Sequence, residues 1–276
     1  MEYRKGFSIK PKEITATGIV IFTDGTNDVS ANQPTCEAYG YTYNASSGTC
    51  EAFRYSTHLE RSFNNTNNIF RGEGNVTGRS TNNALLSGSQ NTTKGNNTNI
   101  LITGKSNEVD NGLDNTSVIG GTYANALRQS EVIIGGGEAL GRNQSSTVQL
   151  AGATTDATVT KLTAQGDGSS YMAVQNNSIF AFEVNLIVLC SGGASGTAGD
   201  YAYLELKGAV QVDDGYNLVF SQSSTTIASV GTTGTAELVA VTDPDITVEV
   251  TGEADIHLEW FASVQITEKK LSTDTF

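Results

Sequence analysis

The sequence contains few of the residues that build metal centres and nucleophilic active sites. Of its 276 residues, two are histidine and three are cysteine. Zinc sites draw clustered Cys and His ligands, and Cys36 and Cys50 have no pair of histidines beside them. His58 and His257 likewise have no serine or cysteine nucleophile motif nearby. We therefore predict no metal, no cofactor and no catalytic residues, and we expect that the chain is not an enzyme.

Positive charge is also scarce. Lys and Arg total 16 against 29 Asp and Glu, which gives a net charge of −13. A surface of this sign repels nucleic acids and anionic membranes, so neither is expected as a partner. No apolar run is long enough to span a bilayer, and residues 1–6 lack the apolar core of a signal peptide. We expect synthesis and folding in a cytoplasm, without membrane insertion.

Proline is rare, at 3 residues, whereas glycine reaches 30. Together with plentiful Asn and Thr, this composition favours an all-β chain, because glycine and asparagine accept the positive φ of tight turns. The glycines are also periodic. Six of them recur every 16 residues, at Gly72, Gly88, Gly104, Gly120, Gly136 and Gly152. Two residues before each stands an apolar side chain, at Phe70, Leu86, Ile102, Val118, Ile134 and Leu150.

A repeat of fixed period predicts a solenoid in which each copy forms one coil and stacks on the next. The coils are expected to be strands, since Ile100 and Ile102 alternate with period two and are β-branched. A second column follows three residues after the first three glycines: Asn75, Asn91 and Asn107. The sequence thus predicts a β-roll or β-helix shaft over residues 63–165, with the six apolar residues stacked as its core.

A single column of such coils has only a small hydrophobic core. Each coil offers about two inward apolar side chains, which contribute about 1.5–3 kcal/mol each on burial. Ordering the backbone costs about 1–2 kcal/mol for every residue of the coil. Packing several copies about a common axis would bury a second apolar face, and closed cyclic symmetry is the usual arrangement. We therefore expect a homo-oligomer.

Residues 1–62 precede the repeat and differ from it. Residues 15–22 are expected to form a strand, and residues 36–43 and 49–53 to form two aromatic strands around a turn. Cys36 and Cys50 flank this turn, which suggests a disulfide. A simple hairpin that pairs Tyr43 with Thr49 would leave the two sulfurs apart, so a bulge or a looser loop would be needed. The bridge stays open at this point, and Cys190 is expected in a core.

Residues 171–276 lose the period of 16 and carry longer strands. Expected strands cover residues 178–190, 201–212, 216–220, 235–241, 246–250 and 256–267. Strands at such intervals predict an antiparallel β-sandwich, with a jelly-roll-like order. Ile187 and Leu189 lie beside Leu186 and Val188, so this strand is apolar on both faces. A second buried face again favours packing against other copies.

Two motifs carry a resemblance to known families. The copy at residues 116–121, Thr-Ser-Val-Ile-Gly-Gly, resembles the β-roll head of trimeric autotransporter adhesins and of many phage fibres. Residues 246–252 followed by 256–264, with Trp260 at the centre, resemble the closing strands of phage tail-fibre tip domains. The resemblance covers residues 64–267. An autotransporter would need a signal peptide and a membrane-anchor barrel, and their absence favours a phage fibre.

The resemblance implies a homotrimeric virion protein, with a tail fibre favoured over a head fibre. Residues 1–62 would attach it to tail, baseplate or capsid proteins, and the tip would meet a host receptor, often a surface glycan. The aromatics first considered for receptor contact are Tyr201, Tyr203, Tyr216 and Trp260. Each also suits a core or an interface. The turn carboxylates Asp213, Asp214, Asp243 and Asp245 are not favoured as catalytic acids or calcium ligands. The alternatives are a capsid head-fibre or decoration protein and a polysaccharide-degrading tip.

Overall fold

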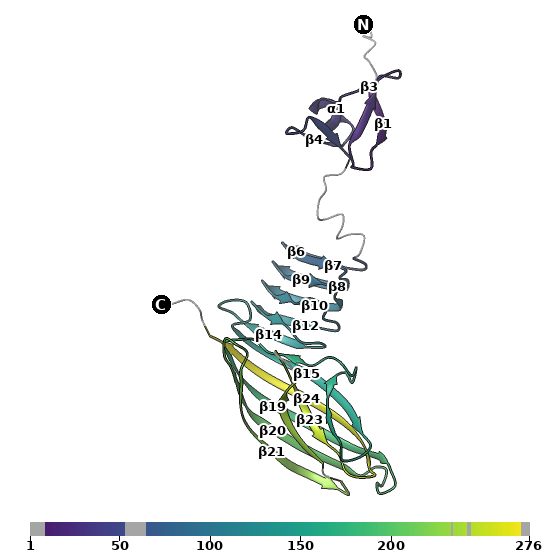
Figure 1. Cartoon of the computed structure of the whole chain (residues 1–276). Helices are drawn as coiled ribbons and strands as arrows, with labels where there is room; N and C mark the ends of the chain where they lie inside the picture. Colours follow the sequence, from purple (N-terminus) through teal and green to yellow (C-terminus); the bar gives the residue numbers. More distant parts are fainter. Residues whose placement is uncertain (1–8, 53–64, 233, 242–243, 272–276) are drawn as a thin grey trace. The chain divides into compact units, whose positions relative to one another are not determined.

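The structure, a computed structural model, describes residues 9–52, 65–232, 234–241 and 244–271. The chain divides into two compact units, residues 1–63 and 64–276 (Figure 1). Strands dominate both units, which confirms the all-β prediction. The ranges predicted as shaft and tip, 63–165 and 171–276, fall almost entirely within the second unit. Among the described residues, no helix is long and apolar enough to cross a membrane.

The first unit is a small β structure with one short helix. Its elements are the antiparallel strands β1 (Lys10–Ile14), β2 (Val20–Thr23) and β3 (Asp28–Val29), the helix α1 (Gln33–Ala38), and the hairpin of β4 (Thr42–Asn44) and β5 (Thr49–Glu51). The buried core consists of Val20, Phe22, Cys36 and Cys50. Such a core is small, so a covalent link adds a large share of this unit's stability.

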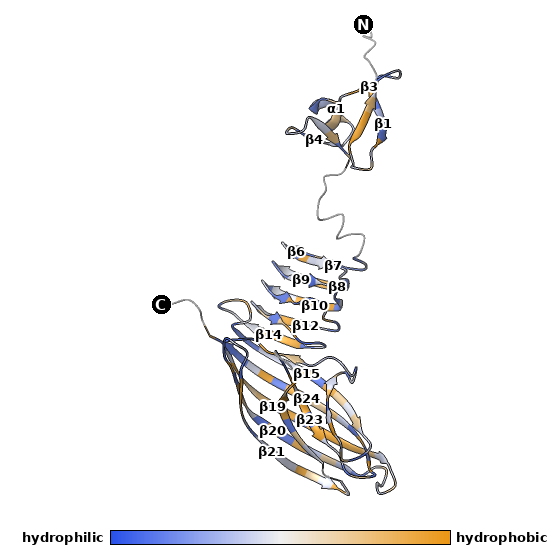
Figure 2. Ribbon diagram, in the orientation of Figure 1, coloured by the Kyte–Doolittle hydropathy of each residue, from blue (hydrophilic) through white to orange (hydrophobic). Residues whose placement is uncertain are grey.

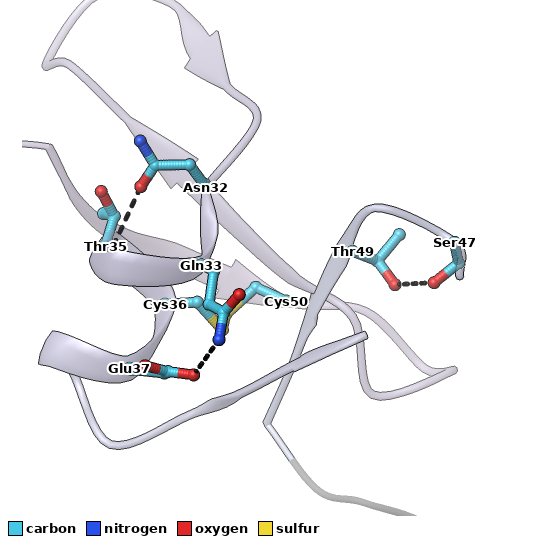
Figure 3. Close-up of a disulfide and its surroundings, with 8 residues drawn as sticks. All are labelled: Asn32, Gln33, Thr35, Cys36, Glu37, Ser47, Thr49 and Cys50. Atoms are coloured by element: carbon cyan, nitrogen blue, oxygen red, sulfur yellow. Dashed lines mark hydrogen bonds between the residues drawn. A yellow bond between two sulfur atoms is a disulfide. The ribbon is translucent and has the colours of Figure 1, made fainter. Parts of the chain in front are cut away.

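Cys36 and Cys50 form a disulfide, with 5.6 Å between their Cα atoms (Figure 3). The expectation that residues 36–43 form a strand is wrong, because Cys36 lies in α1. The Asn32 side chain caps this helix by accepting a hydrogen bond from the Thr35 amide at 3.0 Å, and Pro34 occupies its first turn. Cys36 is therefore outside the hairpin, in which Tyr43 pairs with Cys50. The register obstacle to the bridge does not exist.

The second unit begins with a β-solenoid, which confirms the main prediction from the repeat. One wall consists of parallel strands β6 (Ile69–Glu73), β8 (Asn82–Ser89), β10 (Thr98–Lys105), β12 (Ser117–Thr122) and β14 (Val132–Gly136). The facing wall consists of β7 (Val76–Arg79), β9 (Thr92–Gly95), β11 (Glu108–Val109) and β13 (Asn125–Ala126). Between them lies a narrow core that includes Leu86, Ile102 and Val118, all fully buried.

The predicted apolar column is interrupted after the fourth coil. Phe70, Leu86, Ile102 and Val118 are paired in register from β6 to β12, but Val118 then pairs with Ile133. Ile134 points outward and is 52% exposed, so its assignment to the core is wrong. Leu150 is also outside the column, because it lies in an antiparallel strand and belongs to the next core. Phe70 belongs to the first coil and is half-exposed.

The glycine column shifts with the apolar column. A Cβ at Gly72 would overlap the carbonyl of Gly88, and the same relation links Gly88 to Gly104. In the next two coils Gly121 and Gly135 take this place, since a Cβ at Gly104 would meet Gly121 and a Cβ at Gly121 would meet Gly135. Gly120, Gly136 and Gly152 are therefore not members of the stack. Irregular register between β10 and β12 and between β12 and β14 accounts for the shift.

The chain then reverses and extends the same sheet with antiparallel strands. In spatial order these are β15 (Asn143–Thr154), β24 (His257–Lys270), β19 (Ser178–Gly192), β20 (Tyr201–Val212) and β21 (Leu218–Val230). The facing sheet holds β16 (Val159–Lys161), β18 (Met172–Ala173), β22 (Thr235–Ala240) and β23 (Asp245–Thr251), while β17 (Thr163–Ala164) pairs with β15. The wall of the solenoid and the C-terminal strands thus form one hydrogen-bonded sheet.

The two C-terminal sheets enclose the second core of this unit. Figure 2 shows apolar residues of these strands in orange. In β19 the residues predicted for one face, Phe180, Phe182, Val184, Leu186 and Val188, are all buried there. Cys190 is buried in the same core. Three consecutive strands, β19, β20 and β21, lie side by side as a meander. A jelly roll is built from two Greek keys instead, so these strands do not follow the jelly-roll-like order expected from the sequence.

Candidate functional site

The long sheet of the second unit turns one face toward the two cores and the other toward solvent. We call the solvent side the outer face. Ile179, Ile187 and Leu189 of β19 lie on it, between the buried residues of the same strand. An alternating strand normally places polar side chains on its solvent face, so exposed large apolar residues here require explanation.

One end of the outer face carries an apolar patch, which consists of Ile187, Leu189, Tyr201, Tyr203 and Phe261. Phe261 pairs with Ile187, which pairs in turn with Tyr203 on the next strand. Leu189 pairs with Tyr201 in the adjoining row. The exposed fractions are 54% for Ile187, 45% for Leu189, 44% for Tyr201 and 43% for Phe261. Three neighbouring strands therefore present one continuous apolar surface.

Two of the predicted receptor residues, Tyr201 and Tyr203, lie in this patch. Beside Tyr203 runs a row of polar side chains, which we call the belt: Asn185, Glu205, Lys207 and Glu183. The Tyr203 hydroxyl is 2.6 Å from Oδ1 of Asn185 and 2.8 Å from Oε1 of Glu205. The hydrogen bond to the Glu205 carboxylate raises the pKa of the Tyr203 phenol above its ordinary value. Lys207 then lies 3.2 Å from Glu205 and 3.3 Å from Glu183. The belt fixes the orientation of the Tyr203 ring.

The other two predicted receptor residues are elsewhere. Trp260 faces the core, is 2% exposed and donates a hydrogen bond from Nε1 to Oγ1 of Thr154 at 3.0 Å. Its proposed receptor contact is wrong, because residues of β24 alternate between faces and Trp260 has the inward position. Tyr216 is partly buried and packs against the same core, in a turn where its φ is 61°.

A cleft of about 740 Å³ lies near the opposite end of the outer face. It is formed by the loop after β14, the start of β19, the end of β20 and the end of β24. Its charged lining residues are Glu138, Arg142, Asp213, Lys269 and Lys270. Its other lining residues are Asn177, Ser178, Ile179, Gln211, Val212 and Leu271. We call this space the cleft.

The two carboxylates of the cleft are held in different ways. Glu138 lies 3.2 Å from Nζ of Lys269 and 3.6 Å from Nη1 of Arg142. The hydrogen bond from Lys269 keeps the pKa of Glu138 below its ordinary value. Asp213 accepts hydrogen bonds from Asn217 and Gly215, which lower its pKa as well. Both groups are therefore ionised at neutral pH.

The remaining titratable residues considered from the sequence do not gather into a site. Asp214 accepts a hydrogen bond from Asn177, and burial raises the pKa of Asp245. His257 is exposed on β24. His58 and Asp243 lie outside the described residues. Within the described ranges no three His, Cys, Asp or Glu side chains are placed to hold a metal ion.

The sequence indicated part of the apolar patch and missed the cleft. The presence of Ile187 and Leu189 on the second face of their strand was visible as an apolar run. Phe261 was hidden in a strand whose more conspicuous aromatic, Trp260, faces the core. The cleft draws on four segments that are up to 133 residues apart, from Glu138 to Leu271. No local pattern marks residues that meet only through strand pairing.

Solved structures similar to this chain include three phage tailspike proteins. The tailspike protein of Acinetobacter baumannii phage AM24 covers 76% of this chain and 50% of its own, with 10% identity and a TM-score of 0.29. Tailspike gp49 of the Acinetobacter baumannii bacteriophage Fri1, described as a capsular polysaccharide depolymerase, covers 72% and 45%, with 9% identity and a TM-score of 0.27. The Acinetobacter phage vB_ApiP_P1 tailspike covers 74% and 51%, with 8% identity and a TM-score of 0.22.

The chain thus spans about half the length of these tailspike chains. It matches no protein-family model and no curated protein. The prediction that the chain is not an enzyme is contradicted by a neighbour described as a depolymerase, and it is withdrawn. That prediction rested on the absence of a histidine, serine or cysteine site and on the location of Asp213, Asp214, Asp243 and Asp245 in turns, although glycoside hydrolysis uses paired carboxylates.

Proposed function

We propose that this chain is a bacteriophage virion fibre of the tail-fibre or tailspike kind, which attaches the particle to polysaccharide on the host surface. The observation that carries the proposal is the single sheet that runs from the first solenoid coil, β6, to β21. A solenoid stacks its coils along one direction and forms a stiff rod. Here the rod passes into a broad, partly apolar face without a flexible joint between them. A stiff solenoid that continues into the C-terminal sheet suits a protein that must hold a binding surface away from its anchor.

The proposal assigns the anchor to the first unit. Residues 1–63 form a separate compact unit with its own core and a disulfide. A unit that folds on its own core can dock to another virion protein while the second unit contacts the host. A disulfide persists in oxidising surroundings, which a virion meets after release from the cell. The structural neighbours named above are also phage tail proteins.

We also propose that the chain forms a homotrimer through the apolar patch of the outer face, away from the cleft. The apolar patch is accompanied, on the same face of the solenoid wall, by Ile69, Leu85 and Leu101, which are paired in register. Every copy of this chain carries the same apolar residues at these positions, so copies can bury them against one another. Because these side chains are already about half buried, burying the rest of each contributes about 1 kcal/mol. In this arrangement Tyr201 and Tyr203 lie between copies rather than against a receptor.

Solution mass tests the assembly. The chain has a mass of 29.0 kDa, so a trimer gives about 87 kDa by light scattering. Replacing Ile187 and Phe261 by Asp should yield monomers, while Lys207→Asp in the belt should not. A wild-type chain that stays at 29.0 kDa at micromolar concentration contradicts the assembly.

Adsorption tests the attachment function. Purified protein is incubated with bacteria that the parent phage infects, and it should bind the cells and block adsorption of the phage. Stripping the surface polysaccharide should abolish both effects. Gold-labelled antibody should mark the tail of the virion, and label on capsid facets alone rejects the tail assignment. New reducing ends in isolated host polysaccharide, measured after the same incubation, report cleavage.

A further inference from the structure

We propose that the cleft binds a carboxylated sugar of an acidic polysaccharide, which rests on the proposed function for the polymer to which the sugar belongs. The first observation is its local charge. The chain carries 29 acidic and 16 basic residues, yet Arg142, Lys269 and Lys270 outnumber Glu138 and Asp213 in the cleft. An excess of one sign of charge in a concave site raises the local concentration of ligands of the other sign. The charged lining of the cleft thus has a small excess of positive charge on an otherwise anionic molecule.

The second observation is that both carboxylates already have partners. Glu138 is held by Lys269 at 3.2 Å and by Arg142 at 3.6 Å. Asp213 accepts from the Gly215 amide, the Asn217 amide and the Asn217 side chain, each at 2.8 Å. These interactions occupy acceptors of the carboxylates, whereas Lys269 and Lys270 each offer three donors. Donors of these two lysines remain to meet a ligand anion.

Lys270 is the third observation. Its backbone amide donates to the carbonyl of Arg142 at 2.8 Å, and the neighbouring Leu271 amide donates to the carbonyl of Asn177 at 2.7 Å. Both walls of the cleft are thereby tied to the end of β24. The Lys270 ammonium has no ion-pair partner among the described residues. A fixed backbone with an unpaired ammonium at a cleft fits an anionic ligand.

The fourth observation is the apolar part of the lining. Ile179 is 52% exposed there and Leu271 is 68% exposed, whereas Val212, at 2%, belongs to the core beneath the cleft. Sugar rings present C–H faces that pack on apolar side chains, while their hydroxyls bond polar groups such as Asn177 and Gln211. The volume of about 740 Å³ is in the range of small-ligand sites. Cations, amides and an apolar floor together match a sugar that carries a carboxylate.

The test uses three probes and two variants of the full chain. The probes are a panel of uronic-acid and sialic-acid oligosaccharides, the same oligosaccharides with the carboxyl groups reduced to alcohols, and neutral dextran oligomers. Lys270→Glu reverses one charge of the cleft. Lys207→Glu is the matched control, since Lys207 lies on the same outer face and pairs across strands with Glu183, four residues or about 13 Å along β19 from Ile179. Thermal unfolding checks that both variants fold.

At least one acidic oligosaccharide should bind by titration calorimetry. Reduction of its carboxyl groups and Lys270→Glu should each weaken binding by about tenfold or more. The Lys207→Glu chain should bind like the wild type. Equal binding of acidic and reduced probes, no binding of any acidic probe, or equal loss in both variants overturns the cleft proposal.

The outcomes also separate this inference from the proposed function. If the wild-type and Lys270→Glu chains adsorb equally well to host cells, the cleft is not the site, while the fibre function stands. If the wild-type chain binds acidic oligosaccharides but neither adsorbs to host cells nor blocks the phage, the fibre function fails, while the cleft remains a saccharide site.

Discussion

The guanidinium of Arg128 lies 3.3 Å from Oε2 of Glu268, although the two residues are 140 positions apart. Arg128 stands in the turn between β13 and β14, at the last coil of the solenoid, and Glu268 lies in β24. Neither side chain is exposed by more than 1%. Arg128 also contacts Glu131 at 2.8 Å, and Gln144 donates to Glu268 at 2.8 Å. This buried network joins the solenoid to the C-terminal sheet.

We predict that Arg128→Met destabilises the second unit by about 3–5 kcal/mol, because it leaves two buried carboxylates without their cation. The free energy of unfolding, from denaturant titration at fixed protein concentration, measures the effect. Lys207→Met is the control, since its ion pairs are exposed and contribute little. Equal stability of Arg128→Met and wild type would show that the network is dispensable.

Glu268→Gln should cost less than Arg128→Met. Two carboxylates, Glu131 and Glu268, share one guanidinium, and Oε1 of Glu268 has no hydrogen-bond partner among the described residues. Neutralising Glu268 leaves Arg128 and Glu131 as a balanced pair, so the excess buried charge disappears. Denaturant midpoints of the two variants, measured side by side, decide this order. If Glu268→Gln costs more stability than Arg128→Met, the contact between Glu268 and Arg128 matters more than the equality of positive and negative charges in the network.

The sequence predicted the solenoid correctly because its period is a local property. Leu86 and Ile102 are 16 residues apart and meet directly in neighbouring strands. It could not place the end of the solenoid, since Ile133 and Ile134 are both apolar and either could continue the column. The strand of Leu150 illustrates the same ambiguity. Its period-two pattern fits a parallel coil and an antiparallel strand equally well, and long-range pairing with β24 decides.

The site was less predictable than the fold. Strand alternation showed that Ile187 and Leu189 share a face, but not which face of β24 holds Phe261. The cleft depends on Lys269 and Lys270, which meet Glu138 and Arg142 through the register of β15 and β24. Register between strands that are more than a hundred residues apart follows from the whole core. A single sequence carries no local signal for it.

The glycine stack yields a matched pair of substitutions. Gly88→Ala should destabilise the solenoid by more than about 4 kcal/mol, because the new Cβ overlaps the Gly104 carbonyl at a φ of 109°. Gly120→Ala should cost only about 1–2 kcal/mol, since its φ of 72° is left-handed but nothing lies within 4 Å. Thermal unfolding of both variants gives the comparison. A Gly120 variant as damaged as the Gly88 variant would contradict the register shift described above.

Substitutions of asparagine in the solenoid should also differ in their effect on stability, according to whether the side chain is buried. Asn91 is fully buried, and its side-chain amide donates to Oδ1 of Asn75, to Ser87 and to Gly104 at 3.0–3.1 Å. Asn91→Ala removes these bonds and leaves buried carbonyls unpaired, so about 2–4 kcal/mol of stability should be lost. Asn111→Ala, at an exposed corner, should be nearly silent. Loss of amide hydrogen-exchange protection confined to neighbouring coils would locate the effect.

The disulfide should stabilise the first unit alone. The bridge between Cys36 and Cys50 closes a loop of 14 residues, for which loop-closure entropy gives about 3 kcal/mol. Cys36→Ser should therefore lower the unfolding temperature of residues 1–63 and leave that of the second unit unchanged, since the units have separate cores. Scanning calorimetry of the full chain measures both transitions.

Thiol titration provides the control for that experiment. In denaturant, the oxidised wild-type chain should expose one reactive thiol, that of Cys190, and three after reduction. Because the bridge contributes through the unfolded chain, reduced wild type should unfold at the same temperature as the Cys36→Ser variant. If the second unit also unfolds earlier after reduction, the two units share stability and cannot be treated as independent. If three thiols react before reduction, the bridge is absent, and the core of the first unit must stand without it.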